Sequence, residues 1–342
     1  MSQFSKQRRQ LMIGGMAAVG STAIGSTAIW AEGSPSQPEK FVAVMDWLPS
    51  WKQAAFHLAK VKGWYRDVGL DVQVDDGSGS ATTIAQAFTG RCDVGLASLS
   101  TMAAARSKGT DVVAVAGIIR KNDLGMFVDR KLGISDPRQL AGKNARIIFA
   151  STGFQSLFPP FFKNLGIDVN QVNLTPMVTG SVEGAYLAGQ GEAMITTVPY
   201  VSPIVDEQRP SDIFMFADYG LPFPAHGLVV GRDTLTRRPD ALRKFLSATE
   251  KAWHQVWYGN AQEAINALMD QRPQAKLNAQ LELKRVAAYK PFAGTKATEG
   301  KGDLWMPPED WEAAIKLMRE AEIVLADSKA TDFYTNAFVR ES

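Results

Sequence analysis

Small polar turns follow several apolar runs of this 342-residue chain, and they hold groups that could bind a small solute. At the carboxyl edge of a parallel sheet, such turns aim backbone N–H groups and hydroxyls into one crevice. Helix N-termini at that edge favour anionic or acceptor-rich ligands. The turns span 75–80, 97–101, 150–153 and 179–181, and the candidate ligand-binding residues on them are Ser78, Ser80, Ser98, Ser100 and Thr152.

The same residue types also cap helices without touching a ligand, because a Ser or Thr oxygen accepts the free N–H groups of a first helical turn. For any one turn the sequence leaves both interpretations open. Four such turns in one chain predict that at least two of them face a ligand.

Two aromatic residues and two carboxylates form a second group of candidates. Trp47 directly follows the first apolar run, where its flat side chain could stack on a planar ligand. Asp46 beside it could accept a hydrogen bond from a ring amine, and Tyr200 has a similar place in the second part of the chain. Packing of a loop is the alternative role for Trp47. Glu183 and Asp46 could also meet as paired carboxylates across a cleft.

Signals for catalysis or metal binding are missing. The sequence has no Gly-x-Ser-x-Gly elbow, Walker loop or His-Glu-x-x-His motif. The three histidines lie in unrelated contexts, and the single cysteine, Cys92, begins an apolar run that predicts a packed thiol. We therefore predict no catalytic residue, no metal site and no cofactor, so the protein is not expected to be an enzyme.

The elements that must position these residues alternate between strands and helices. Short apolar runs at 41–45, 70–74, 93–97, 112–119, 145–150, 172–177, 193–197 and 223–230 predict strands, and segments with helical spacing separate many of them. Beyond Pro239 the pattern is mainly helical. Alternation of this kind builds an α/β protein with largely parallel sheets flanked by helices. The pattern restarts after Pro137, which indicates a second α/β unit.

The N-terminus predicts an export signal. Arg8 and Arg9 precede a glycine- and alanine-rich apolar run over 13–29, and a small residue, Ala31, follows. This order is typical of a signal peptide, here 1–31, cleaved near Ala31. The arginine pair resembles a twin-arginine signal, with the general secretory route as the alternative. A membrane anchor is the other interpretation, although the glycines make a weak span. Residues 32–37 form a linker.

Net charge argues against nucleic acid as a partner. The formal charge of +2 includes Lys6, Arg8 and Arg9, and removal of these three leaves −1 on the mature chain. A nearly neutral body lacks the basic surface of a nucleic-acid-binding protein. With 45% hydrophobic and 21% charged residues, the chain has the composition of a protein with packed cores that does not span a membrane.

Four motifs resemble those of the type II periplasmic binding proteins, in the group that handles thiamine-pyrimidine precursors. Sulfonate-, taurine- and nitrate-binding proteins are wider relatives of that group. The motifs are Asp46-Trp47-Leu48-Pro49, the Ala-x-x-Lys-Gly-aromatic-aromatic segment that runs through Gly69-Leu70-Asp71-Val72, Gly90-Arg91-Cys92-Asp93-Val94-Gly95, and Tyr334-Thr335-Asn336-Ala337-Phe338. The resemblance spans nearly the whole mature chain.

The resemblance implies two lobes joined by two crossover strands, with lobe one at 38–130 plus 226–342 and lobe two at 131–225. A small planar solute would bind between the lobes, lined by Asp46, Trp47 and the serine turns on one side and by Thr152, Glu183 and Tyr200 on the other. The implied protein is a periplasmic monomer that passes a pyrimidine-like thiamine precursor to the permease subunits of an ABC importer. A sulfonate, nitrate or aromatic acid is the alternative ligand.

Two other functions stay open at this point. A periplasmic sensor subunit would bind the same ligand, and neighbouring permease and ATPase genes would argue against it. A eukaryotic branch of the family synthesises the thiamine pyrimidine and needs a cysteine-rich motif. This chain has one cysteine, which argues against that enzyme.

Overall fold

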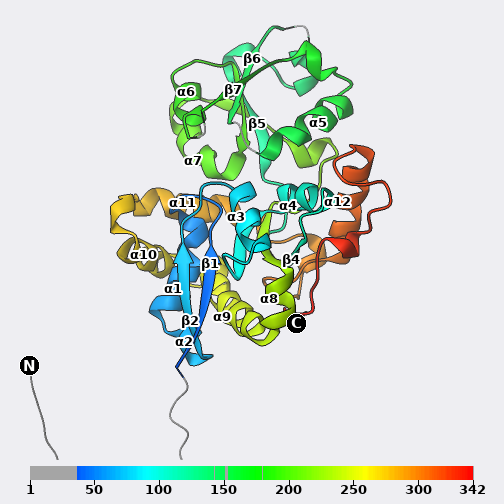
Figure 1. Cartoon of the computed structure of the whole chain (residues 1–342). Coiled ribbons are helices and arrows are strands. Elements are labelled where there is room, and N and C mark those ends of the chain that lie inside the picture. Colours follow the sequence, from blue (N-terminus) through cyan, green and yellow to red (C-terminus); the bar gives the residue numbers. More distant parts are fainter. Residues whose placement is uncertain (1–36, 142, 151–152, 179, 342) are drawn as a thin grey trace, which may run out of the picture. The chain divides into compact units, whose positions relative to one another are not determined.

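The computed structural model describes residues 37–341 apart from 142, 151–152 and 179 (Figure 1). The predicted signal peptide 1–31 and nearly all of the linker 32–37 lie outside the described residues. Residues Pro38–Ser342 form one compact unit. Within it, the described strands form two five-stranded sheets, which we call the first and second sheet.

The first sheet has the strand order β2-β1-β3-β10-β4. In it, β1 pairs in parallel with β2 and β3, whereas β10 runs antiparallel between β3 and β4. The second sheet has the order β7-β6-β8-β5-β9 and repeats this plan, with β5 antiparallel between β8 and β9. The strands are β1 (Glu39–Val44), β2 (Leu70–Asp75), β3 (Val94–Ser98), β4 (Val112–Ile119), β5 (Leu124–Asp129), β6 (Arg146–Ala150), β7 (Asn173–Met177), β8 (Ala193–Thr197), β9 (Ser211–Met215) and β10 (His226–Gly231).

The predicted α/β class with two sheets flanked by helices is confirmed, but the sheets are mixed rather than largely parallel. The reason is that β5 and β10 each enter a sheet from the other one, so they run back against strands that helices connect in parallel. A strand that reaches its sheet by a helical crossover is parallel to its neighbour, whereas one that arrives from the opposite end is not.

Helices flank both sheets and carry most of the cores (Figure 1). The helices grouped around the first sheet are α1 (Ala54–Val61), α2 (Trp64–Asp67), α3 (Ser80–Phe88), α4 (Leu99–Ser107), α8 (Arg232–Arg237) and α9 (Pro239–Tyr258). The second sheet is packed by α5 (Phe158–Asn164), α6 (Val182–Leu187) and α7 (Val198–Gln208). Outside these helices, α10 (Ala261–Gln271) packs on α1, and α11 (Ala279–Tyr289) packs on α10 and α7. Side chains of α12 (Pro308–Glu320) reach both cores: Ala314 belongs to one, and Trp311 packs with β4 and β10 in another.

The chain passes between the sheets twice, through residues 120–123 and 216–225, which we call the first and second crossing. The two crossings are hydrogen-bonded to each other: Asn122 Nδ2 donates to the Leu221 carbonyl at 2.8 Å. The Ala225 N–H similarly donates to the carbonyl of Ile119 at 2.9 Å. Two adjacent crossings form the kind of short connection about which two halves can rotate.

The sheet boundary differs from the predicted lobe boundary at Arg130. Strand β5 ends at Asp129 and belongs to the second sheet, so the chain leaves the first sheet after Ile119. The sequence does not reveal the passage from the first to the second sheet, because only four polar or charged residues separate β4 from β5. We therefore refer to the first half (38–119 with 226–341) and the second half (124–215), and the division into lobes stays a prediction.

A buried histidine in the first half gives a stability prediction. His57 lies in α1 with 1% of its surface exposed, and neither ring nitrogen has a hydrogen-bond partner among the described residues. Burial, aided by Arg272 and Lys60, lowers the pKa of His57 to about 3. An unfolded histidine takes up a proton near pH 6.5, so acid favours the unfolded chain.

We expect His57→Leu to remove this acid sensitivity. Between pH 7.5 and pH 5, the wild type should lose about 2 kcal/mol more unfolding free energy than the variant, because its unfolded state is protonated below pH 6.5 while the folded state is not. Urea unfolding at both pH values measures the difference. His254→Gln, at a residue on the exposed side of α9, is expected to keep the acid-dependent loss. Parallel pH profiles for wild type and His57→Leu would contradict the prediction.

Candidate functional site

The loop after β1 places Asp46 at the edge of the first sheet. Asp46 is 5% exposed, and its Oδ2 accepts a hydrogen bond from Lys52 Nζ at 2.6 Å. Nε2 of His226 lies 3.3 Å from the same oxygen. Burial by itself would raise the pKa of Asp46, but Lys52 and His226 outweigh it and hold the pKa well below its ordinary value. Asp46 is therefore an ionised carboxylate that already has two partners.

Trp47 is half-buried beside Asp46, and its backbone fastens the neighbouring turn. The Trp47 carbonyl accepts the Gly77 N–H at 3.0 Å and the amide of Gln53 at 3.0 Å. A side chain at Gly77 would place its Cβ 1.9 Å from the Met45 carbonyl oxygen, so only glycine allows this approach. The first polar turn is thus locked onto the Trp47 loop, with Ser78 exposed upon it.

Three predicted serines lie together where β3 ends. The Ser98 N–H donates to Ser80 Oγ at 2.9 Å, and the hydroxyls of Ser98 and Ser100 are 3.0 Å apart. Ser98 also caps α4 by accepting the Thr101 N–H at 3.4 Å. The capping interpretation therefore holds for Ser98. Contact of these hydroxyls with a ligand stays a prediction.

The second half brings Glu183 and Tyr200 to the matching edge of its sheet. Glu183 lies in the first turn of α6 after β7, and Tyr200 lies in the first turn of α7 after β8. Burial raises the pKa of Tyr200, the nearby Arg285 lowers it, and the carboxylates of Glu282, Glu183 and Asp46 raise it further. Burial and the surrounding negative charges therefore disfavour ionisation of the Tyr200 hydroxyl. Thr152, the remaining candidate, lies outside the described residues.

A buried cluster behind these residues links both crossings. Asp123 ends the first crossing, and its Oδ2 accepts the Tyr289 hydroxyl at 3.0 Å. Burial and the Asp123 charge raise the pKa of Tyr289 well above its ordinary value. His226, directly after the second crossing, has Nδ1 3.9 Å from Asp123 Oδ2 and 3% of its surface exposed. This cluster ties the β1 edge, through Asp46, to both crossings.

Some of the charged side chains at these two sheet edges form ion pairs, and one carboxylate does not. Two basic side chains that contact predicted residues are ion-paired: Lys52 with Asp46, and Arg285 with Glu282 at 2.6 Å. Among the described residues, no ion pair is formed by Glu183. Among the described residues of these edges, Glu183 is thus a carboxylate without an ion-pair partner, whereas Lys52 and Arg285 are both paired. Such a surface suits a ligand that donates hydrogen bonds, such as an amine or an amino-substituted ring.

Sequence reasoning missed Glu282, Arg285, Asp123 and Tyr289. Glu282 and Arg285 are three residues apart on an amphipathic helix, and such a pair ordinarily indicates a solvated face. The tightly bonded Asp123 belongs to a short polar connection without periodicity. Only the fold shows that these residues are buried.

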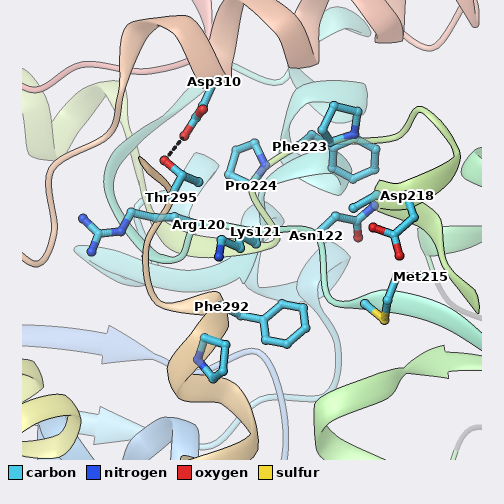
Figure 2. Close-up of a pocket in the computed structure, with 13 residues that line it drawn as sticks. Arg120, Lys121, Asn122, Met215, Asp218, Phe223, Pro224, Phe292, Thr295 and Asp310 are labelled. Carbon is cyan, nitrogen blue, oxygen red and sulfur yellow. Dashed lines mark hydrogen bonds between the residues drawn. The ribbon is translucent and has the colours of Figure 1, made fainter. Parts of the chain in front are cut away.

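Two cavities lie away from the predicted residues. One, of about 390 Å³, is bounded by both crossings and by Phe292, and Figure 2 shows Asn122, Phe223 and Pro224 around it. The other, of about 920 Å³, lies beside α9 and the loop 294–303. Among the described residues, no predicted ligand-binding residue lines either cavity.

The described residues contain no His, Cys, Asp and Glu group that could hold a metal ion. Within the same part of the chain, no helix combines the length and apolar character needed to cross a membrane. Cys92 is 3% exposed, and burial raises the pKa of its thiol to about 12, so it is a packed thiol as predicted.

Two mixed sheets of this strand order, joined by two crossings, define the type II periplasmic-binding-protein fold. The ligand-binding component of an ABC-type import system from Staphylococcus aureus matches with a TM-score of 0.66 at 12% identity, over 88% of this chain and 97% of that one. The alkanesulfonate-binding protein SsuA from Xanthomonas axonopodis pv. citri matches with a TM-score of 0.63 at 14% identity, over 86% and 96%.

The chain belongs to the NMT1/THI5-like family, whose model matches residues 51–264. A 4-amino-5-hydroxymethyl-2-methylpyrimidine phosphate synthase of Saccharomyces cerevisiae, THI13, is 25% identical over 72% of this chain and 75% of its own length. The formylaminopyrimidine-binding protein of Halalkalibacterium halodurans is 22% identical over 80% and 86%. The riboflavin-binding protein RibY of Chloroflexus aurantiacus is 21% identical over 96% and 95%. The family predicted from the four sequence motifs is confirmed.

Proposed function

We propose that this protein is the exported solute-binding component of an ABC importer and that it captures a small planar, amine-bearing heterocycle between its two halves. A pyrimidine-like thiamine precursor is the favoured ligand. The protein holds the ligand and delivers it to the permease without transforming it. Export relies on the N-terminal signal predicted from the sequence.

The pairing of charges at the facing edges supports this ligand most strongly. Among the described residues Glu183 forms no ion pair, whereas Lys52 and Arg285 are occupied by Asp46 and Glu282. A sulfonate or nitrate needs an available cation or several free N–H groups to replace its water. An amino group on a flat ring instead needs an acceptor and an aromatic surface, for which Glu183 and Trp47 are suited.

The names of the relatives agree with a planar ligand. One relative binds formylaminopyrimidine and another binds riboflavin, and both are flat nitrogen heterocycles. The yeast relatives are synthases of a related pyrimidine. Against synthesis by this chain stands its single cysteine, which is buried and has a raised thiol pKa. Mass spectrometry of the purified protein incubated without added pyrimidine tests this point, and the appearance of a pyrimidine phosphate would contradict the transport function.

We expect calorimetry to show binding of 4-amino-5-hydroxymethyl-2-methylpyrimidine and no binding of taurine or nitrate. Glu183→Gln should lower the affinity about 10- to 100-fold, because a charge-assisted hydrogen bond contributes about 1.5–3 kcal/mol. Trp47→Ala should cost about 1–3 kcal/mol of binding through lost stacking. Glu192→Gln is the matched control, since Glu192 precedes the opposite end of β8, where it accepts the Arg146 N–H.

Tight binding of taurine or nitrate, with the pyrimidine inactive, would overturn the proposed ligand class. Equal affinities of wild type, Glu183→Gln and Trp47→Ala for the pyrimidine would instead remove these residues from the site. Mass spectrometry of small molecules that co-purify with the protein gives an independent identification of the ligand.

A further inference from the structure

One arginine of the first half holds Tyr200 of the second half at two points. The Arg285 guanidinium carbon lies 3.8 Å from the centroid of the Tyr200 ring, so the cation stacks on one ring face. Its Nε also donates to the Tyr200 carbonyl at 3.1 Å. The ring and the backbone of Tyr200 are therefore both fixed by one side chain from α11.

The Arg285 guanidinium is itself fixed by a buried carboxylate, Glu282. Glu282 Oε1 accepts from Arg285 Nη1 at 2.6 Å, and Glu282 Oε2 accepts the Trp51 N–H at 2.7 Å. Glu282 is 2% exposed and Arg285 is 8% exposed. The Trp51 ring packs on Tyr289, with 4.5 Å between ring centroids. Glu282 is buried and is held by hydrogen bonds from both Arg285 and the backbone of Trp51. Arg285 therefore has little freedom to move away from the Tyr200 ring.

The contact has a neighbour that serves as a control. Lys284, next to Arg285 on α11, pairs with Glu207 at the end of α7. Both lysine and glutamate are more than half exposed, at 55% and 63% of their side chains. This second bridge joins the same two helices without touching Tyr200. The pair Arg285 and Lys284 therefore separates an effect on Tyr200 from a general effect on the contact between α7 and α11.

We propose that Arg285 is a positioning residue that determines specificity by covering one face of Tyr200 and presenting the other face to the ligand. This inference rests on the proposed function and deepens it. A ring that is already fixed loses no further freedom when a flat ligand stacks on it, so the affinity for flat ligands increases. A ligand without a flat face gains nothing from this arrangement. Arg285 thus selects planar rings without touching them.

Arg285→Lys is the central test, because lysine keeps the charge beside Glu282 but lacks the planar guanidinium and the Nε donor. We expect it to weaken binding of 4-amino-5-hydroxymethyl-2-methylpyrimidine about tenfold in calorimetry. Lys284→Gln should stay within twofold of the wild type. Tyr200→Leu should lose at least as much affinity as Arg285→Lys, and the double variant should lose no more than Tyr200→Leu alone. A merely structural arginine would give additive losses.

A measurement without ligand keeps the test independent of the solute. In protein labelled with fluorotyrosine, the ¹⁹F signal of Tyr200, assigned through Tyr200→Phe, should shift and broaden in Arg285→Lys and stay unchanged in Lys284→Gln. An unchanged signal in Arg285→Lys, or additive losses in the double variant, would overturn the inference while leaving the proposed function in place. If the wild type binds no pyrimidine, the proposed function fails, and the specificity role of Arg285 fails with it.

Discussion

Glu282→Gln is expected to lower the free energy of unfolding by about 3–5 kcal/mol, because it leaves a buried arginine charge without its partner. Glu282 is 2% exposed and bonds both Arg285 and the backbone N–H of Trp51. Glutamine has nearly the same shape and can still accept one hydrogen bond, so the expected loss comes from the missing charge. Urea unfolding at pH 7 measures it.

Glu207→Gln provides the comparison for this prediction. Glu207 also takes part in the contact between α7 and α11, through Lys284, but its side chain is 63% exposed. Exposed ion pairs contribute about 1 kcal/mol or less. Similar small losses in both variants would show that Glu282 and Arg285 are better solvated than their burial indicates.

Trp253→Ala is the second change with a large expected effect, a loss of about 3–5 kcal/mol of unfolding free energy. Trp253 lies in α9 with 0% of its surface exposed. Its ring centroid is 5.1 Å from that of Trp257 and 6.0 Å from that of Trp51. Removal of the indole leaves a cavity that these rigid rings cannot fill by small shifts. Chemical denaturation followed by circular dichroism measures the loss.

Two further substitutions test whether a cavity causes this loss of stability. One is at Tyr258, on the same helix, and the other is at Trp253 itself. Tyr258→Ala removes an aromatic ring that is 57% exposed and should cost less than about 1 kcal/mol. Trp253→Phe should restore most of the stability, because it refills much of the space and removes an indole N–H that has no hydrogen-bond partner. Equal losses for Trp253→Ala and Trp253→Phe would argue against a cavity as the cause.

The strongly periodic parts of the fold could be predicted from the sequence. The strands β1 to β4 and the long helix α9 follow apolar runs or stripes that a single pattern describes. The strands β5 and β9 were missed, and so was the helix α7. Pro199 and Pro203 disguise α7, since proline within a helix ordinarily indicates a break. Strand β9 has only five residues and alternates weakly, so its pairing with β5 decides its conformation.

The candidate site likewise has some residues that the sequence predicts and other features that only the structure shows. The residues after strand ends, such as Asp46, Ser98 and Tyr200, could be predicted because parallel strands deliver their carboxyl ends to one edge. The ion pairs that occupy Lys52 and Arg285 join residues through the tertiary fold, and no local pattern reveals them. The unpaired state of Glu183 within the described residues is likewise visible only in three dimensions. Spacing alone therefore predicts which residues meet at the sheet edges, whereas the pairing of their charges is visible only in the tertiary structure.

The position of β10 has a consequence for biosynthesis. Strand β10 (His226–Gly231) lies between β3 and β4, although the whole second sheet precedes it in the chain. A ribosome must therefore release the segment for the second sheet completely before the first sheet can close, and β3 and β4 wait for the strand that lies between them. Pairings between residues this distant in sequence form slowly. The N-terminal strands of a nascent chain thus lack their partner β10 until it is synthesised, so the unpaired edge stays open to other contacts for longer.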